Sequence, residues 1–228
     1  MNTSDVVLEF YNRGFESKIN ENLLEYNYKF PEEKVFDYVT SVTEIPVDQF
    51  LDNYYSIGKD RNITSKDLLQ FSSLEDATIT ICERYIEECN PGFSAEETGR
   101  LLLKNEQAKR LLAYRKYGEN HAKAAEAFGL VYSITNVFFL SGLGLVYLQL
   151  SDKQREQLLT RMVLRTHEIE QLYRNYRQGK HTSAREYMNM LSDSTYRRRR
   201  SNLRRLIRVL SESREYDFSD FINSITVE

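Results

Sequence analysis

The sequence predicts a mainly helical protein, and three observations support this prediction. The 228 residues include only nine glycines and three prolines, the residues that most often interrupt helices. Leu, Glu, Arg and Lys, which favour helices, are plentiful, and the content of 41% hydrophobic and 29% charged residues is ordinary for a folded globular protein. Several hydroxyl residues are followed three positions later by an acidic residue, a pattern typical of helix starts. We therefore expect one or two folded cores built mostly from helices.

Residues 1–62 are predicted to form an acidic N-terminal region with no assigned fold. Five Lys and Arg residues stand against twelve Asp and Glu residues within positions 1–60. Acidic and apolar residues alternate irregularly over residues 3–30, which suggests one or two short helices. The stretch Val39-Thr-Ser-Val-Thr43 favours an extended segment. A small helical subdomain or a protein-docking arm is the interpretation we adopt.

Helix-start patterns follow one another from residue 63 onward. Thr64–Asp67 and Ser73–Asp76 each have the hydroxyl and acid spacing, and the second is expected to begin a helix of about sixteen residues that ends near Cys89. Ser94–Glu97 forms a further capping box and begins a short helix to about Leu103. A helical stretch from Glu106 to about Tyr114 leads through Gly118 into a helix that ends at Phe128, with Gly129 as its C-cap.

A β-hairpin is predicted directly after that helix. Leu130–Tyr132 and Asn136–Leu140 are two strand-like runs around Ser133-Ile-Thr135, with the tip of the hairpin at residues 133–136. Ser141–Gly144 then closes the hairpin and begins another helix. Three helices followed by a hairpin and a helix is the order of a winged helix-turn-helix, which we assign to residues 63–150.

The C-terminal part of the chain predicts a second helix-turn-helix over residues 151–211. A solvated helix is expected from Asp152 to about Arg177, and Ser183–Glu186 is a capping box that begins a short helix ending near Leu191. Residues 192–195 then turn into a basic helix. Residues 212–228 hold one basic residue against five acidic ones and form an acidic tail.

The basic helix is the strongest indication of function. Seven arginines fall within residues 197–208, in a chain whose formal net charge is -3. On a helical wheel the apolar residues gather in one sector, and most of the arginines occupy the neighbouring flank. The apolar sector holds Tyr196, Leu203, Leu206, Ile207 and Leu210. The flank holds Arg197, Arg200, Arg204 and Arg208, extended by Arg198 and Arg205, whereas Arg199 points toward the apolar side and braces the fold.

Arginine is suited to nucleic acid because its planar guanidinium is always charged and can contact phosphate, or guanine O6 and N7, with two hydrogen bonds. We expect Arg197, Arg200, Arg204 and Arg208 to contact phosphates, with Arg198 or its neighbours at base edges. Two alternatives stay open. The arginines can form a solvated face, or they can pair with an acidic protein surface such as the N-terminal region.

A second set of DNA-binding residues is expected in Lys116–Lys123. Asn120 is the candidate adenine reader, and Arg115, Lys116 and Lys123 are candidate phosphate contacts. The alternative is that Tyr117 and His121, four residues apart, pack together while Asn120 caps the helix; His121 is expected to be structural in either case. The turn of the hairpin carries no Lys or Arg, so that Ser133, Thr135 and Asn136 offer at most hydrogen bonds to phosphate.

The sequence does not predict a catalytic or metal site. Glu32-Glu33-Lys34 contains part of a metal-dependent nuclease motif without the strand-borne Asp that such a site needs. His121-Ala-Lys123 has no Asp at a suitable distance. Cys82 and Cys89 are about 10 Å apart along a predicted helix, too far for a disulfide, and are interpreted as core residues. We therefore predict a non-enzymatic protein without metal or cofactor.

Two blocks of sequence resemble a known class of module. They are Lys116–Lys123 with Gly129-Leu-Val131 and Leu140-Ser-x-x-Gly144, and Ser192-x-Ser194-Thr195-x-x-Arg198-Arg199-x-x-Asn202-Leu203. Both are similar to winged-helix modules attached to bacterial restriction-modification and phage-defence proteins, over roughly residues 75–210. The resemblance implies a double-stranded DNA-binding protein that recognises DNA for such a system or regulates its genes.

The expected partners follow from these interpretations. Double-stranded DNA comes first, and an effector nuclease, another defence-system subunit or a second copy of the chain are further candidates. The alternative function is a helical adaptor or oligomerisation protein whose arginine helix docks on an acidic partner. No apolar run approaches the length of a membrane span, and residues 1–5 lack the features of a signal peptide, so we expect a cytoplasmic protein without membrane contact.

Overall fold

The computed structural model describes residues 32–57, 68–88, 92–103 and 110–227. These residues are mainly helical, as the sequence predicts, with two small sheets. They divide into two compact units. Unit 1 contains the described residues of Val42–Gln70 and Lys153–Glu228, and unit 2 those of Asn12–Ser41 and Phe71–Asp152. The predicted helices within residues 3–30, the Thr64–Asp67 helix start and Cys89 lie outside the described residues.

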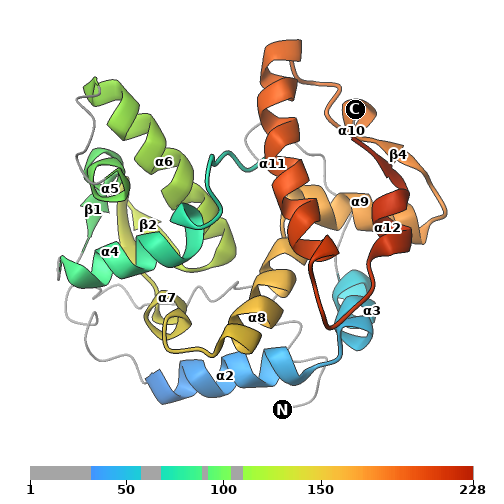
Figure 1. Ribbon diagram of the computed structural model, residues 1–228, viewed down its shortest axis with the longest axis horizontal. Helices are drawn as coiled ribbons and strands as arrows, with labels where there is room; N and C mark the ends of the chain where they lie inside the picture. The colour runs from blue at the N-terminus through green and yellow to red at the C-terminus, as the bar shows by residue number, and fades with distance from the viewer. Residues whose placement is uncertain (1–31, 58–67, 89–91, 104–109, 228) are drawn as a thin grey trace. The chain divides into compact units, whose positions relative to one another are not determined.

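Unit 2 contains a three-stranded antiparallel sheet and the helices around it (Figure 1). The sheet has the order β1-β3-β2. Along the chain its elements are η2 (Asp76–Thr80), α4 (Ile81–Glu87), β1 (Phe93–Ser94), α5 (Ala95–Leu102), α6 (Leu111–Phe128), β2 (Val131–Ile134), β3 (Val137–Leu140) and α7 (Gly142–Tyr147).

Three of the caps that the sequence predicts in unit 2 are present. Ser94 accepts a hydrogen bond from the backbone of Glu97, and the Glu97 carboxylate accepts one from the backbone of Ser94. Gly129 ends α6 with a φ of 82°, a left-handed conformation that glycine adopts without steric cost. Ser141 caps α7 by accepting a hydrogen bond from the Gly144 backbone. These ends are therefore set by local sequence.

Helix α6 is longer than the sequence predicts, since it runs through Gly118 without a break. The reason is tertiary. A Cβ atom at Gly118 would lie 1.9 Å from the carbonyl oxygen of Ala95, and one at Gly99 would lie 2.0 Å from that of Tyr114. The two glycines therefore let the backbones of α5 and α6 approach closely, which fixes how α6 crosses α5.

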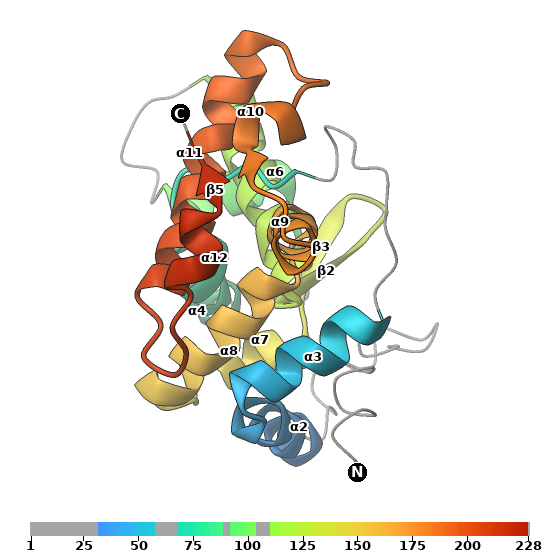
Figure 2. The ribbon, with the colours of Figure 1, turned by 90° about the vertical axis from the view of Figure 1, so that its right-hand side faces the viewer.

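The predicted hairpin is present, with a tighter turn than expected (Figure 2). Residues 133 and 134 belong to β2, and only Thr135 and Asn136 form the loop. Their φ angles of 50° and 66° are the two positive values that a type I′ turn requires. Asparagine is among the residues that tolerate this conformation best.

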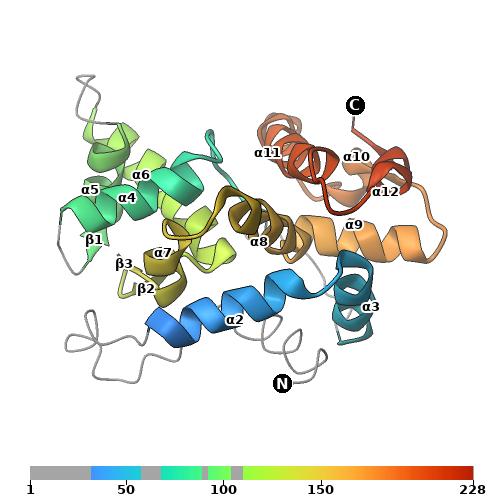
Figure 3. The ribbon, with the colours of Figure 1, turned by 60° about the horizontal axis from the view of Figure 1, so that its bottom comes forward.

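Unit 1 is built from helices, among them α8, α9, α11 and α12 in Figure 3. It also has one pair of short parallel strands. Its long helix α11 packs against α9 and α12. Along the chain its elements are α3 (Val47–Ile57), α8 (Asp152–Leu164), α9 (His167–Arg177), β4 (Thr182–Ser183), α10 (Ala184–Tyr187), α11 (Asp193–Ser211), α12 (Ser219–Asn223) and β5 (Ile225–Thr226). Helix α2 (Glu32–Glu44) includes residues of both units.

Two predictions for these segments are wrong. The solvated helix expected from Asp152 to Arg177 is two helices, separated at Arg165 and Thr166, and Leu158, Met162 and Ile169 are fully buried. The stretch Val39–Thr43 is helical rather than extended. Burial of both Val39 and Val42 outweighs the weak strand preference of β-branched residues.

The acidic C-terminal segment is part of the packed structure of unit 1. It contributes α12 and β5, and Phe218, Phe221 and Ile225 are buried. Strand β5 pairs with β4 through Thr182 and Ile225. This pairing ties the C-terminal segment to the strand that immediately precedes α10.

Candidate nucleic-acid interface

Helix α11 has the two faces that the sequence predicts. Tyr196, Leu203, Leu206 and Leu210 are buried, and Ile207 is half-buried. Asn202 is also buried and donates from Nδ2 to the carbonyl oxygen of Leu69 at 3.0 Å. Sequence reasoning missed this residue, although its position next to Leu203 at the edge of the apolar sector was a signal. The other side of α11 carries the arginines.

The arginines of this flank differ in solvent exposure and in their hydrogen-bond partners. Arg197, Arg198, Arg204 and Arg208 are exposed, and Arg200 and Arg205 are half-buried. Arg204 donates to the carbonyl oxygen of Val227 at 3.0 Å, and Arg208 pairs with Glu212 at 2.7 Å. Within the described residues, the side chain of Arg197 forms no hydrogen bond or ion pair. Arg197 is therefore the member most available to an anionic ligand.

Half-buried side chains in this group are held by α11 itself. Arg200 lies over the ring of Tyr196, with 5.8 Å between guanidinium carbon and ring centroid. Arg205 donates to Asn202 Oδ1 at 3.2 Å. Arg199 is half-buried, and burial lowers its pKa while the nearby Glu168 carboxylate opposes that shift. This environment agrees with the bracing role expected for Arg199.

Arg185 in α10 is a residue that sequence reasoning missed. Its guanidinium donates to the carbonyl oxygen of Leu191 at 3.2 Å and to the Asp193 carboxylate at 2.7 Å, and it lies 4.9 Å from the ring centroid of Tyr196. Arg185 thereby connects α10 to the first turn of α11. It also offsets the charge of Asp193, the acidic residue that would otherwise repel phosphate at this end of the helix.

The second predicted set lies on α6. Arg115, Lys116 and Lys123 are exposed and Asn120 is half-buried, and the set is centred on the side of α6 opposite the buried Tyr114 and His121. Lys123 pairs with Glu119 at 2.6 Å, which reduces the charge it offers to a ligand. Asn120 lies in the middle of α6 and is not a cap.

His121 is structural, as expected. It is buried, and its Nε2 accepts from the backbone N–H groups of Ser72 and Ser73 at 3.2 and 3.3 Å. Its Nδ1 therefore carries the proton and donates to the carbonyl oxygen of Tyr117 at 2.8 Å. The rings of Tyr117 and His121 stack with centroids 4.0 Å apart. The packing of Tyr117 with His121 that belongs to the alternative interpretation is thus present.

The turn of the hairpin offers little to DNA. Thr135 and Asn136 are exposed, but the Ser133 hydroxyl donates to the Glu126 carboxylate at 2.6 Å. The same carboxylate accepts from the Ser133 backbone at 3.0 Å. A negative charge held beside β2 disfavours a phosphate at Ser133.

Other candidate chemistry does not assemble into a site within the described ranges. No group of three or more metal-ligating side chains is present in the described part of the chain. Cys82 is buried, and burial raises the pKa of its thiol. Glu32 and Glu33 are the first two residues of helix α2.

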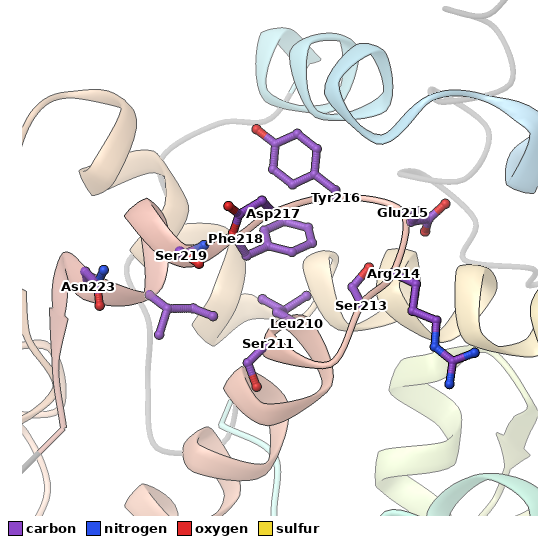
Figure 4. A pocket seen from close by; sticks show the side chains of 11 residues that line it. Leu210, Ser211, Ser213, Arg214, Glu215, Tyr216, Asp217, Phe218, Ser219 and Asn223 are labelled. Carbon is purple, nitrogen blue, oxygen red and sulfur yellow. Dashed lines mark hydrogen bonds between the residues drawn. The ribbon is translucent and has the colours of Figure 1, made fainter.

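An open pocket of about 530 Å³ lies where α11 is connected to α12 (Figure 4). Its lining includes Ser213, Arg214, Tyr216, Asp217 and Phe218. Hydrogen bonding from the Ser219 side chain, together with that from the Ser219 backbone N–H, lowers the pKa of Asp217. The lining residues include neither histidine nor cysteine, so none of the serines has an imidazole base beside it.

Comparisons with protein-family models, with curated proteins and with solved structures find no match to this chain. Among the described residues, no helix has the length and apolar character needed to cross a membrane. The two sets of predicted DNA-binding residues belong to different units, one on α6 of unit 2 and the other on α11 of unit 1.

Proposed function

We propose that the protein is a non-enzymatic double-stranded DNA-binding protein with two reading modules. The observation that carries the proposal is the arginine flank of α11. Arg197, Arg198 and Arg204 are exposed on a helix whose opposite side is fixed by buried apolar residues. Such a rigid row of guanidinium groups suits the phosphates of a duplex, which are spaced regularly and contacted by charge-assisted hydrogen bonds.

The element order supports a winged helix in unit 2. Helix α4, strand β1, helices α5 and α6 and the hairpin β2–β3 follow one another, and the sheet order is β1-β3-β2. In this interpretation α6 is the recognition helix and the hairpin is the wing. Because the wing tip lacks Lys and Arg, Arg115 and Lys116 are the main phosphate contacts of this module and Asn120 is the adenine reader.

Unit 1 repeats the first part of this order, which supports a second helix-turn-helix. The order of elements along the chain is the same in the two units: α9, β4, short α10 and long α11 in unit 1 match α4, β1, α5 and α6 in unit 2. Both two-residue strands end in a serine that caps the following helix, Ser94 and Ser183. The later part differs, because β4 pairs in parallel with β5 in place of an antiparallel hairpin.

A role in restriction-modification or phage defence is the biological part of the proposal. It rests on the resemblance of residues 75–210 to winged-helix modules of such systems. The protein would then recognise DNA for a separate effector or regulate the genes of the system, in the cytoplasm. Identification of the neighbouring genes tests this part, since a gene for a nuclease or methyltransferase beside this one supports it and unrelated metabolic neighbours contradict it.

Charge reversal on α11 tests DNA binding. A fluorescently labelled duplex of about 30 base pairs is titrated with the wild type, with Arg197→Glu and with a variant in which Arg197, Arg200, Arg204 and Arg208 are all Glu, at low salt where phosphate contacts are strongest. Arg214→Glu is the matched control, because Arg214 is an exposed arginine of unit 1 outside α11. The proposal predicts weaker binding for Arg197→Glu and no retention by the fourfold variant, with Arg214→Glu close to the wild type.

Light scattering on the same samples measures the oligomeric mass and distinguishes DNA binding from the alternative function, a helical adaptor that docks on an acidic partner. Unchanged mass with lost DNA retention agrees with DNA binding by α11. A changed mass with intact DNA binding would instead assign the arginines to a protein interface, and equal binding by all four proteins would overturn the proposal.

A further inference from the structure

Helix α6 exposes a leucine in line with its polar DNA-binding candidates. Leu112 is 59% exposed. At about 100° per residue, positions 112, 115, 116, 119, 120 and 123 fall on one side of a helix. These positions form what we call the α6 stripe, which consists of Leu112, Arg115, Lys116, Glu119, Asn120 and Lys123. Every member is exposed or half-buried.

Single exposed leucines are common and need no explanation in themselves. The position of this one is what matters. Leu112 occupies the N-terminal end of α6, one turn before Arg115 and Lys116, and the N-terminal residues of a recognition helix are the ones that reach base edges. In the described part of the chain, no hydrogen bond or ion pair engages the side chains of Arg115, Lys116 or Asn120. The stripe therefore combines one apolar group with available cationic and amide groups.

Duplex DNA offers one apolar group in the major groove, the 5-methyl of thymine. Leu112, with Arg115 and Lys116 beside it, matches the major groove, where a thymine methyl group lies near the backbone phosphates. A purely apolar protein surface would leave Arg115 and Lys116 without anionic partners. The charge of the stripe thus favours duplex DNA as the occupant.

We propose that Leu112 is a specificity-determining residue that contacts the 5-methyl group of thymine in the major groove. This inference rests on the proposed DNA binding by unit 2 and adds a base preference to it. Arg115 and Lys116 place α6 on the phosphates, Asn120 reads an adenine, and Leu112 selects a thymine about two turns of helix away from Asn120 along the same side.

Replacement of thymine by uracil tests the proposal, because it removes the methyl group and keeps charge, pairing and hydrogen-bonding groups. A duplex is first selected by the wild type from a randomised pool and is then prepared with thymine or with uracil in both strands. We expect about fourfold weaker binding of the uracil duplex, the effect of losing contact with one methyl-sized apolar group.

Leucine variants assign the effect to one side chain. Leu112→Ala should bind the thymine duplex more weakly and no longer distinguish it from the uracil duplex, whereas Leu112→Met should retain the distinction. Leu111→Ala is the matched control, since Leu111 is 57% exposed and points about 100° away from Leu112. It should discriminate as the wild type does. Because both leucines are exposed, thermal unfolding of the variants should stay unchanged.

The outcomes separate this inference from the proposed function. Salt-sensitive DNA binding that yields no selected sequence, or that treats thymine and uracil duplexes alike, overturns the role of Leu112 and leaves DNA binding in place. Equal loss of discrimination in Leu111→Ala and Leu112→Ala also overturns it. Absence of DNA binding at low salt overturns both.

Discussion

Arg161 of α8 and Glu215 of the α11–α12 connection form an ion pair at 2.7 Å in which the arginine side chain is fully buried. The same guanidinium donates to the carbonyl oxygens of Gln157, Thr43 and Ile45. Burial lowers the pKa of Arg161, and Glu215 opposes this shift by stabilising the charged form. The pair thus joins three segments of unit 1 that are distant in sequence.

Removal of one partner of this pair should be strongly destabilising. Glu215→Ala leaves the Arg161 charge buried without its carboxylate, and we expect a loss of about 3–5 kcal/mol in the free energy of unfolding, measured by urea denaturation. Glu212→Ala is the control, because it breaks the solvent-exposed pair with Arg208 and should leave the unfolding midpoint unchanged. Similar midpoints for the two variants would contradict a stabilising role for the buried pair.

Gly118→Ala should destabilise unit 2, although the same change usually stabilises an exposed helix. The new Cβ would lie 1.9 Å from the Ala95 carbonyl oxygen, so α5 and α6 have to separate. We expect a loss of about 3 kcal/mol, which thermal unfolding can measure. Asn120→Ala, two residues away on the outer side of α6, should have little effect. A Gly118→Ala protein as stable as the wild type would show that the close approach is not required.

The Ser94–Glu97 capping box should make stability depend on pH. Hydrogen bonds from Ser94 lower the pKa of Glu97. A carboxyl group with a lowered pKa in the folded state contributes stability above its unfolded pKa of about 4.3, and this contribution is lost as the pH falls through the folded value. Ser94→Ala should cost about 1 kcal/mol at neutral pH.

The difference in stability between wild type and Ser94→Ala should therefore shrink on acidification below the unfolded pKa. Chemical denaturation at a series of pH values measures it. A difference that stays constant from neutral to acidic pH would assign the effect of Ser94 to something other than the Glu97 carboxylate.

Local sequence predicted much of unit 2 correctly. The caps at Ser94, Gly129 and Ser141 and the hairpin depend on residues close to one another, and their signals are short-range. Gly118 was different. Its local pattern indicated a break, and only the approach of α5 shows why a glycine lies inside one continuous helix.

Unit 1 shows where sequence information ends. The charged residues of α8 indicated a solvated helix. Arg161 is nevertheless buried, because it pairs with Glu215, and this partner could not be predicted since it lies 54 residues away in the chain. The buried face of α11 was predictable from spacing, whereas Arg185 was missed because its partners Leu191, Asp193 and Tyr196 come together only in the folded turn.

Salt dependence of duplex binding tests the central proposal most directly. Neutralisation of about four phosphates by α11 alone contributes about −3.6 to the slope of log affinity against log salt, so a fourfold rise in salt should weaken binding at least about a hundredfold. Arg197→Ala should reduce the steepness by about 0.9, the contribution of one phosphate. Binding that is insensitive to salt, or a slope that Arg197→Ala leaves unchanged, would contradict the assignment of the arginine flank to DNA.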